Sequence, residues 1–431
     1  MVEVKDGISE YLEIKGRNHL EGIVEISGAK NSALPNMTAA LLTEENVILE
    51  NVPHLLDVFT MKKLLEHIGF SIEITHKGIF SFNLRNLNSL EAPYELVSKM
   101  RASILVLGAM LTRFGYAKVA LPGGCSIGAR PVDLHLHALK QMGANIKVEH
   151  GYIIATAPNG LKGTEIIFPK ITVTGTENIL MAAVLAEGET VIKNAAKEPE
   201  VVDLAVMLKK MGAKIKGEGT DTILVKGVKK LHGVVHKIIP DRIEAGTFAI
   251  LSALFGGKIL IKNYPFEYLN YVHKILNKIG ISIIKIGEKE ALVKKNLELK
   301  PVDIITKEYP FFPTDLQAQF MTLLSVVKGV SRITESIFEN RFMHVPELKR
   351  LGANIKIENR TAIIKGVKKL TGAEIRATDL RASAAMVIAG LIADGTTRIY
   401  DIYHLDRGYE NIDVKLRSLG ALVSRGKIPQ N

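Results

Sequence analysis

Hydrophobic and polar positions follow one pattern that returns six times along the chain. A helix-like segment with lysine, glutamate or arginine on one side ends in Leu-x-x-hydrophobic-Gly, and successive glycines lie 68 to 74 residues apart. Glycine is the expected C-terminal cap of an amphipathic helix, so we predict six helices that end there with one face exposed to solvent. All copies but the last are expected to lead into a strand. The six segments span residues 65–69, 139–143, 208–212, 276–280, 348–352 and 416–420.

A second set of six segments, out of phase with the first, is apolar on nearly every side. Such a helix is buried all round, and none of the six reaches the ~18 residues that a membrane span needs, so protein must cover them. Each is followed by a short loop and a β-branched strand, which gives six units of ~70 residues, each of strand–helix–strand–helix kind. The apolar segments span residues 33–42, 102–111, 179–186, 245–254, 317–327 and 382–393.

These two patterns together predict an α/β fold with helices inside and sheets outside. This is the inverse of the usual barrel, which keeps its strands at the centre. A chain of 431 residues is long enough for two or three domains, and three buried helices per domain would divide the six units into two similar domains. The expected fold is therefore a two-domain inside-out α/β barrel. Chance matches among common α/β patterns do not explain six paired copies at such regular spacing.

Composition narrows the class of protein. Hydrophobic residues make up 47% of the chain and charged residues 23%, which is ordinary for a soluble globular protein. A single cysteine excludes an internal disulfide and a cysteine-based zinc cluster. The N-terminus lacks a basic segment followed by an apolar one, so no secretion signal is expected and the predicted location is the cytoplasm.

The formal net charge of +11 suggests a nucleic-acid-binding protein as one alternative. The lysines are spread along the chain, however, and the sequence has no tryptophan and no nucleic-acid motif. We interpret most of the excess charge as solvated surface, with part of it attracting an anionic substrate. We therefore expect no nucleic-acid partner.

Polar and charged residues stand at the predicted entrances of the apolar helices. A helix N-terminus favours an acid, so cations there break a local preference and point to function. Buried helix N-termini with cations form a site for a multiply charged anion, most simply phosphate. The structural alternative is that each arginine pairs with a neighbouring aspartate and locks the fold. The entrance residues are Lys30, Asn31, Arg101, Glu177, Asn178, Asp241, Arg242, Thr314, Asp315, Asp379 and Arg381.

The one cysteine, Cys125, lies in a glycine-rich stretch, LPGGCSIGARPVDLH, at residues 121–135. The glycines predict an irregular loop rather than a helix or strand. Arg130 follows five residues later, and a nearby cation lowers the pKa of an accessible thiol and makes it more reactive. The alternative is a small buried hydrophobe, which is how most free cysteines behave. A glycine-rich loop is a poor core element, which favours the reactive thiol.

With these motifs in order along nearly the whole chain, the sequence resembles the enolpyruvyl transferases, most closely the branch that acts on UDP-N-acetylglucosamine. The resemblance implies two inside-out barrel domains, residues 32–239 and residues 1–31 with 240–431, and an active site in the cleft between them. The sister branch of the shikimate pathway shares the repeats but lacks the cysteine loop in this form. The matching segments are residues 28–35, 100–103, 122–134, 240–244, 312–319, 338–347, 378–383 and 406–410.

The resemblance also implies a reaction. The enolpyruvyl group of phosphoenolpyruvate would move to the 3′-hydroxyl of UDP-N-acetylglucosamine with release of phosphate, the first committed step of peptidoglycan synthesis. No cofactor and no metal are expected. Lys30, Arg130 and Arg407 would hold phosphoenolpyruvate, with Arg381 at its carboxylate end. Cys125 would protonate the methylene carbon and could form a thioketal with the substrate.

Two carboxylates compete for the role of the base that takes the hydroxyl proton: Asp315 fits it, and Asp379 is the rival. Thr172 and Ile337 stand where Ser and Val are usual in the family, and both lie on the expected nucleotide side. A catalytically silent regulator that binds the UDP-sugar is the second functional hypothesis, and no oligomer is implied. The residues expected on the UDP-sugar are Asn31, Arg101, Arg130, Pro131, Val132, Asp133, Leu134, Lys170, Ile171, Thr172, Val173, Asp315 and Ile337.

Overall fold

The computed structural model describes residues 9–75, 78–122 and 132–428. The chain divides into two compact units. The central unit holds the described residues from Gly28 to Ile239, and the terminal unit holds those up to Ser27 and from Pro240 onward. Each unit is described by itself below.

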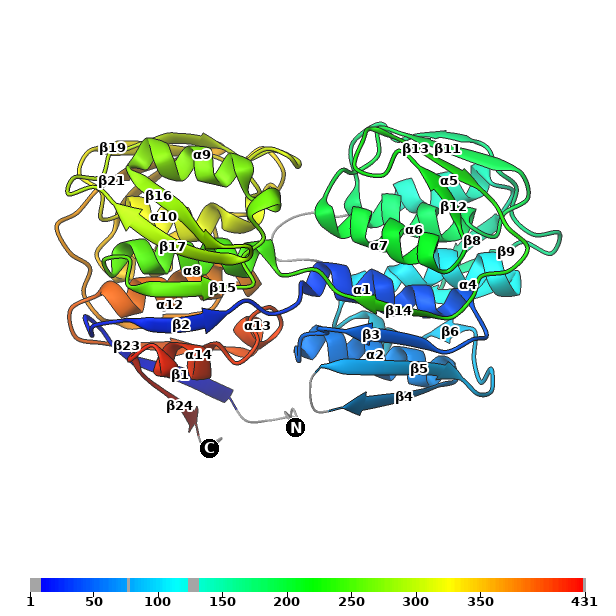
Figure 1. Ribbon diagram of the computed structural model, residues 1–431, viewed down its shortest axis with the longest axis horizontal. Coiled ribbons are helices and arrows are strands. Elements are labelled where there is room, and N and C mark those ends of the chain that lie inside the picture. Colours follow the sequence, from blue (N-terminus) through cyan, green and yellow to red (C-terminus); the bar gives the residue numbers. More distant parts are fainter. Residues whose placement is uncertain (1–8, 76–77, 123–131, 429–431) are drawn as a thin grey trace. The chain divides into compact units, whose positions relative to one another are not determined.

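Three four-stranded sheets surround three buried helices in the described part of the central unit (Figure 1). The sheets have the orders β14-β3-β5-β4, β6-β7-β9-β8 and β10-β11-β13-β12, and the first pair in each is parallel. The inner helices are α1 (Lys30–Ala39), α4 (Val106–Phe114) and α6 (Val173–Ala183), and the outer ones are α2 (Leu56–Ile68), α5 (Asp133–Gln141) and α7 (Pro199–Lys210). Short helices are α3 (Tyr94–Val97) and the 3-10 segments η1 (Ala40–Leu42) and η2 (Arg101–Leu105). The strands are β3 (Val47–Glu50), β4 (Phe70–Thr75), β5 (Ile79–Leu84), β6 (Glu91–Ala92), β7 (Tyr116–Ala120), β8 (Asn145–Glu149), β9 (Tyr152–Thr156), β10 (Glu165–Ile167), β11 (Glu189–Lys193), β12 (Lys214–Lys216), β13 (Thr222–Lys226) and β14 (Val234–Lys237).

The described part of the terminal unit repeats this plan with the sheets β2-β15-β17-β16, β18-β19-β21-β20 and β22-β23-β1-β24. Its inner helices are α8 (Arg242–Leu254), α10 (Gln317–Leu324) and α12 (Leu380–Ile392). Its other helices are α9 (Asn270–Ile279), α11 (Val345–Arg350), α13 (Tyr403–Asp406), α14 (Ile412–Ser418) and the 3-10 segments η3 (Phe266–Tyr268) and η4 (Thr314–Leu316). The strands are β1 (Ser9–Lys15), β2 (Gly22–Glu25), β15 (Ile259–Lys262), β16 (Ile281–Gly287), β17 (Glu290–Lys295), β18 (Asp303–Ile305), β19 (Val330–Thr334), β20 (Asn354–Glu358), β21 (Thr361–Lys365), β22 (Glu374–Arg376), β23 (Thr396–Tyr400) and β24 (Leu422–Ile428).

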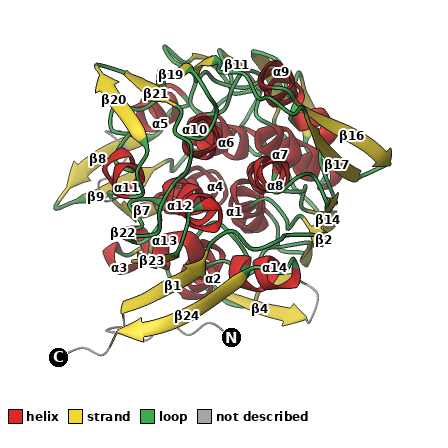
Figure 2. Cartoon of the chain, turned by 90° about the vertical axis from the view of Figure 1, so that its left-hand side faces the viewer, coloured by secondary structure: helices red, strands yellow, loops and turns green. Residues whose placement is uncertain are grey.

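Burial separates the two kinds of helix as the hydrophobic pattern predicts. Every residue of α10 is buried, as are residues 381–391 of α12, whereas α9 buries the stripe Val272, Ile275, Leu276 and Ile279 and exposes its opposite face. Figure 2 shows β16, β20 and β24 at the rim of the terminal unit, with α8, α10 and α12 inside. The predicted inside-out α/β barrel architecture is confirmed. Within the described residues, none of the helices combines the length and the apolar character needed to cross a membrane.

The six repeat glycines all adopt a positive φ, between +92° and +135°. Other residues rarely take this conformation, so glycine ends each helix here for a backbone reason. One detail of the prediction is wrong: the sixth glycine, Gly420, also leads into a strand, β24. The prediction also missed the second strand of each hairpin, for example β9 after β8. The pattern indicated only one strand after each glycine.

An asparagine marks the end of three strands that have a parallel neighbour. Asn51, Asn194 and Asn263 follow β3, β11 and β15 with φ values of 56° to 58°. Each side-chain amide donates a 2.9 Å hydrogen bond to a carbonyl just beyond the parallel neighbour strand. Asparagine tolerates the left-handed conformation and supplies the donor, so it fixes the corner between sheet and helix in these three repeats.

Candidate active site

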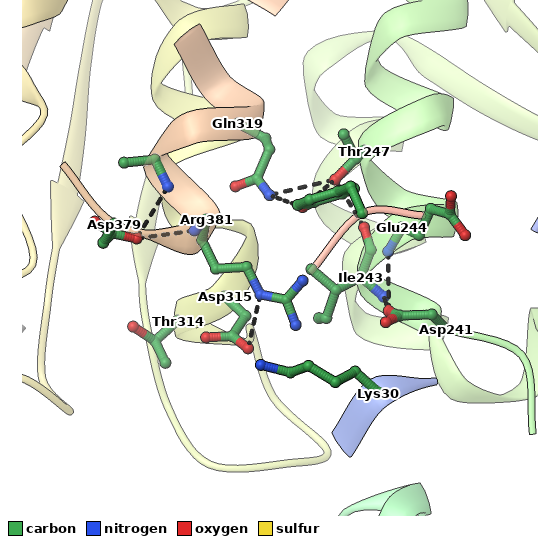
Figure 3. Close-up of polar contacts among 12 residues, drawn as sticks. Lys30, Asp241, Ile243, Glu244, Thr247, Thr314, Asp315, Gln319, Asp379 and Arg381 are labelled. Carbon is green, nitrogen blue, oxygen red and sulfur yellow. Dashed lines mark hydrogen bonds and ion pairs between the residues drawn. The ribbon is translucent and has the colours of Figure 1, made fainter. Parts of the chain in front are cut away.

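The carboxylate of Asp315 lies between two arginines of the terminal unit. Arg341 Nη2 is 2.9 Å from Asp315 Oδ1. Arg381 Nε is 3.2 Å from Asp315 Oδ2 (Figure 3). Both arginine side chains are 5% exposed, while that of Asp315 is 26% exposed. Two guanidinium groups favour the ionised carboxylate. The arrangement therefore joins two buried cations to an acid that solvent can still reach.

Arg381 stands in the first turn of α12, whose N-cap is Asp379. Asp379 Oδ1 accepts hydrogen bonds from the backbone N–H groups of Arg381 and Ala382, at 2.8 and 3.0 Å. Burial disfavours the charged guanidinium, but Asp315, Tyr409 and Asp241 outweigh it and raise the pKa of Arg381. Its Nη1 is buried and has no hydrogen-bond partner among the described residues. A buried cationic donor of this kind is suited to an anionic ligand.

Two histidines lie near Asp379. His344 is 1% exposed, and neither ring nitrogen has a hydrogen-bond partner among the described residues. Burial lowers the pKa of His344 to about 4, against the opposing effect of Asp379. Burial, with the charge of Arg407, also lowers the pKa of His404. Both rings are therefore uncharged at neutral pH, and the positive charge near Asp379 comes from arginine.

Glu335 is a site residue that sequence reasoning missed. Its Oε1 accepts hydrogen bonds from the backbone N–H groups of Ile337 and Phe338, at 2.9 and 3.2 Å, and its Oε2 accepts one from Thr314 Oγ1, at 2.8 Å. Glu335 is 1% exposed. It thereby links the loop of Ile337 to the turn that carries Asp315, two residues expected on the same substrate. Ile337 and Phe338 are close to Glu335 in the sequence, but Thr314 is not, and no sequence motif predicts that pairing.

In the central unit, Lys30 is the first residue of α1 and pairs with Asp57 of α2. The Nζ of Lys30 is 3.0 Å from Asp57 Oδ2, and the two side chains are 11% and 4% exposed. A lysine at a helix N-terminus opposes the helix dipole, and this ion pair offsets that cost. Asn31, next along the helix, is exposed.

His135, on α5, is buried against two polar residues of α6. Its Nδ1 is 3.0 Å from Asn178 Nδ2, and its Nε2 is 3.4 Å from Thr174 Oγ1. Burial and the charge of Arg101 lower the pKa of His135 to about 4, with Asp133 opposing. Helices α5 and α6 therefore meet at one buried, uncharged imidazole, which the charge of Arg101 also influences.

The entrance of α6 differs in detail from the prediction. The helix begins at Val173, and Thr172 is its N-cap, with Oγ1 accepting a hydrogen bond from Gly175 N at 3.2 Å. Glu177 and Asn178, expected at the entrance, lie in its second turn and are buried. The apolar pattern misplaced the start because Thr and Gly in the first turn interrupt it.

Other predicted residues occupy varied settings. Lys170 and Asp133 are exposed, Val132 is buried, and Ile171, Leu134 and Ile337 are partly buried. Arg407 follows α13, with its guanidinium carbon 6.0 Å from the centre of the Tyr403 ring. Cys125, Arg130 and Pro131 lie outside the described residues.

The structural alternative for the arginines holds in a modified form. Arg381 does pair with an aspartate, but the partner is Asp315 from another helix entrance rather than its neighbour Asp379. Arg341 is the second arginine that binds Asp315. The sequence did not single it out, although it lies within the matching segment 338–347. Its pairing with Asp315 depends on tertiary structure.

Comparison with known proteins gives consistent results. Residues 14–416 match the family model described as EPSP synthase (3-phosphoshikimate 1-carboxyvinyltransferase). The chain is 51% identical over 426 residues to a UDP-N-acetylglucosamine 1-carboxyvinyltransferase of Paramagnetospirillum magneticum, covering 97% of this chain and 99% of that protein. It is 54% identical over 415 residues to the protein of the same name from Koribacter versatilis, covering 96% and 95%.

Solved structures share the fold. The enolpyruvyl transferase NikO from Streptomyces tendae superposes with a TM-score of 0.88 at 24% identity, covering 98% of this chain and 100% of that one. An EPSP synthase from Acinetobacter baumannii gives 0.75 at 19% identity, covering 97% and 100%.

Proposed function

Because the chain belongs to the enolpyruvyl transferase family, we propose that it moves the enolpyruvyl group of phosphoenolpyruvate onto the 3′-hydroxyl of UDP-N-acetylglucosamine and releases phosphate. The observation that carries this proposal is the identity of 51–54%, over nearly the whole chain, to proteins named for that acceptor. The buried arginines beside Asp315 support it, because both substrates are anionic.

Phosphoenolpyruvate is bound by cations in this proposal. Lys30, Arg130 and Arg407 hold its phosphate side, and Arg381 lies at its carboxylate. The buried Nη1 of Arg381 offers a donor for that contact. Guanidinium and ammonium groups neutralise the substrate's charge, so no metal is required by the chemistry.

The UDP-sugar is bound by a second set of residues, drawn from the helix entrances and the Ile337 loop. Thr172 and Val173 begin α6, Arg101 begins η2, and Asp133 and Leu134 begin α5, so backbone N–H groups of helix starts support this role. The full set is Asn31, Arg101, Arg130, Pro131, Val132, Asp133, Leu134, Lys170, Ile171, Thr172, Val173, Asp315 and Ile337. Residues on both sides of position 240 thus contribute, and we propose two barrel domains, residues 32–239 and residues 1–31 with 240–431.

The reaction is an addition followed by an elimination. The sugar 3′-oxygen bonds to the carbon that bears the phosphate, while Cys125 gives its proton to the methylene carbon. Asp315 takes the hydroxyl proton, or Asp379 does so. Loss of a proton from the new methyl group then expels phosphate and restores the double bond. Asp379 Oδ1 already caps α12, which supports Asp315 as the base.

The product would enter peptidoglycan synthesis in the cytoplasm, and through it cell-wall biogenesis, cell shape and cell division. The same proposal makes Cys125 the target of the epoxide antibiotic fosfomycin. No partner protein and no nucleic acid are part of it.

Phosphate release by the purified chain tests the proposal. We expect release that requires both phosphoenolpyruvate and UDP-N-acetylglucosamine. Shikimate 3-phosphate is the control acceptor. Phosphate release from phosphoenolpyruvate with this acceptor, but not with UDP-N-acetylglucosamine, would assign the sister activity. A silent UDP-sugar-binding regulator would release no phosphate with either acceptor, although it would bind the sugar nucleotide in calorimetry.

A further inference from the structure

A buried carboxylate outside the proposed site, Asp203, joins three elements of the central unit. Asp203 lies on α7 and is 5% exposed. Its Oδ2 accepts hydrogen bonds from Ser32 Oγ and, at 3.1 Å, from Asn36 Nδ2, both on α1. Its Oδ1 is 3.0 Å from His236 Nε2 on β14. Figure 1 shows α1, α7 and β14 in one part of the central unit, and α7 contacts both of the others.

The hydrogen-bond directions in this cluster follow from the chemistry of its groups. A carboxylate only accepts, so Ser32 Oγ–H, Asn36 Nδ2–H and His236 Nε2–H all donate to Asp203. His236 Nδ1 can then accept from the ammonium of Lys210, whose Nζ is 3.4 Å away. Ser32 and Asn36 are fully buried and His236 is 2% exposed, so these bonds to a charged group form out of water, where they are strong.

Helix α1 lacks two of the local hydrogen bonds that usually stabilise a helix, so it depends on contacts with other elements. Its N-cap, Ala29, makes no side-chain hydrogen bond to the helix. Pro35 lies inside the helix and cannot donate the usual hydrogen bond to the carbonyl of Asn31. Ser32 and Asn36 are four residues apart and so lie on one side of α1, where a single carboxylate can hold two successive turns.

We propose that Asp203 is a positioning residue for Lys30 and Asn31. By tethering Ser32 and Asn36 it fixes the first turn of α1, and His236 with Lys210 fixes Asp203 in turn. This inference rests on the proposed role of Lys30 and Asn31 in binding the two substrates. The site residues of α1 therefore depend on a cluster whose members are not among the residues proposed to bind either substrate.

Three variants and a control test this role. Ser32→Ala removes one tether and leaves a residue that favours helix. Asp203→Ala removes the whole anchor, whereas Asp203→Asn keeps an oxygen that can accept from α1. Thr112→Val is the matched control, because it removes a part-buried hydrogen bond between α4 and α6 of the same unit, from Thr112 Oγ1 to Ala182 O at 2.7 Å, in which α1 takes no part.

The readouts are the KM values and kcat for phosphate release, together with hydrogen exchange of the peptide covering residues 29–39. Misplacement of a binding group by about 1 Å can cost up to about 100-fold, so we expect KM for phosphoenolpyruvate to rise at least about fivefold in Ser32→Ala and more in Asp203→Ala. Exchange of residues 29–39 should speed up in both. Asp203→Asn should recover most of the KM, and Thr112→Val should change neither quantity.

Wild-type KM and wild-type exchange in Ser32→Ala and Asp203→Ala would overturn the inference, as would an equal effect in Thr112→Val. If Asp203→Ala does not fold, Ser32→Ala decides alone. If the wild-type chain releases no phosphate, the proposed function fails, but hydrogen exchange of residues 29–39 still tests the tether.

Discussion

Arg341 Nη2 lies 2.9 Å from Asp315 Oδ1, and this contact ties the proposed base to a buried cation that the sequence did not single out. Arg381 holds the other oxygen of the same carboxylate. The two guanidinium groups therefore fix the position of the carboxylate that we propose as the proton acceptor. An anionic substrate at Nη1 of Arg381 would share one guanidinium with Asp315, which Nε holds, and this would couple substrate binding to the proposed base.

Replacement of the two candidate bases by asparagine separates their roles. Asp315→Asn cannot take the hydroxyl proton, so we expect kcat to fall by about 10²–10⁴-fold. Asp379→Asn keeps the N-cap of α12, because asparagine caps a helix as well as aspartate, and we expect its melting temperature to match the wild type. A large loss of kcat in Asp379→Asn alone, with Asp315→Asn active, would reverse the assignment. Steady-state phosphate release and thermal melts supply both measurements.

The Lys30–Asp57 pair can be tested for stability and activity independently. Lys30→Met leaves the carboxylate of Asp57 buried without this partner, so we expect a loss of about 3–5 kcal/mol in the free energy of unfolding. The double variant Lys30→Met/Asp57→Asn removes the buried charge and should recover most of that loss. Both variants lack the Lys30 ammonium, so in both we expect the KM for phosphoenolpyruvate to stay above the wild-type value. Recovery of activity in the double variant would mean that Lys30 serves the fold alone.

Cys125 is the one thiol of the chain, which makes its reactivity simple to measure. We expect incubation with fosfomycin and UDP-N-acetylglucosamine to add one drug molecule to the intact mass, because the proposed role of Cys125 as the acid requires an accessible, reactive thiol. Cys125→Ser is the control and should stay unmodified. An unchanged mass for the wild-type chain would argue for a sealed, inert cysteine instead.

His135 predicts a pH dependence of stability. Burial and Arg101 lower its pKa to about 4 in the folded chain, whereas an unfolded histidine titrates near 6.5. Between those values the unfolded state binds more protons, so this histidine's contribution to stability is present above about pH 6.5 and is lost as pH falls toward 4. The slope is at most about 1.4 kcal/mol per pH unit. Denaturant unfolding between about pH 5 and about pH 7 should show a shallower slope for His135→Gln; an identical slope would exclude His135 as a source.

Local signals account for what the sequence predicted of the fold. The repeat glycines and the all-apolar helices each act within a few residues, and a helix cap or a buried face can be read from such a window. The start of α6 was misplaced because Thr172 and Gly175 look like loop residues until the cap is seen. The corner residue Asn51 lacked a visible signal because its partner, the carbonyl of Ile238, lies nearly 190 positions away in the chain.

In the candidate site too, local features could be predicted and contacts between distant residues could not. The charged helix entrances could be found one by one, and the matching motifs named their expected roles. The contacts that hold them could not, because Arg341 meets Asp315 and Asp203 meets Ser32 only after folding. The roles of Cys125 and Arg130 stay predictions, since these residues lie outside the described part of the chain.

The most direct test of the account is the identity of the product. Purified chain incubated with phosphoenolpyruvate and UDP-N-acetylglucosamine should convert the sugar nucleotide to a species heavier by one enolpyruvyl group, with one phosphate released for each, as seen by mass spectrometry. Unmodified UDP-N-acetylglucosamine in the presence of folded chain and both substrates would contradict it.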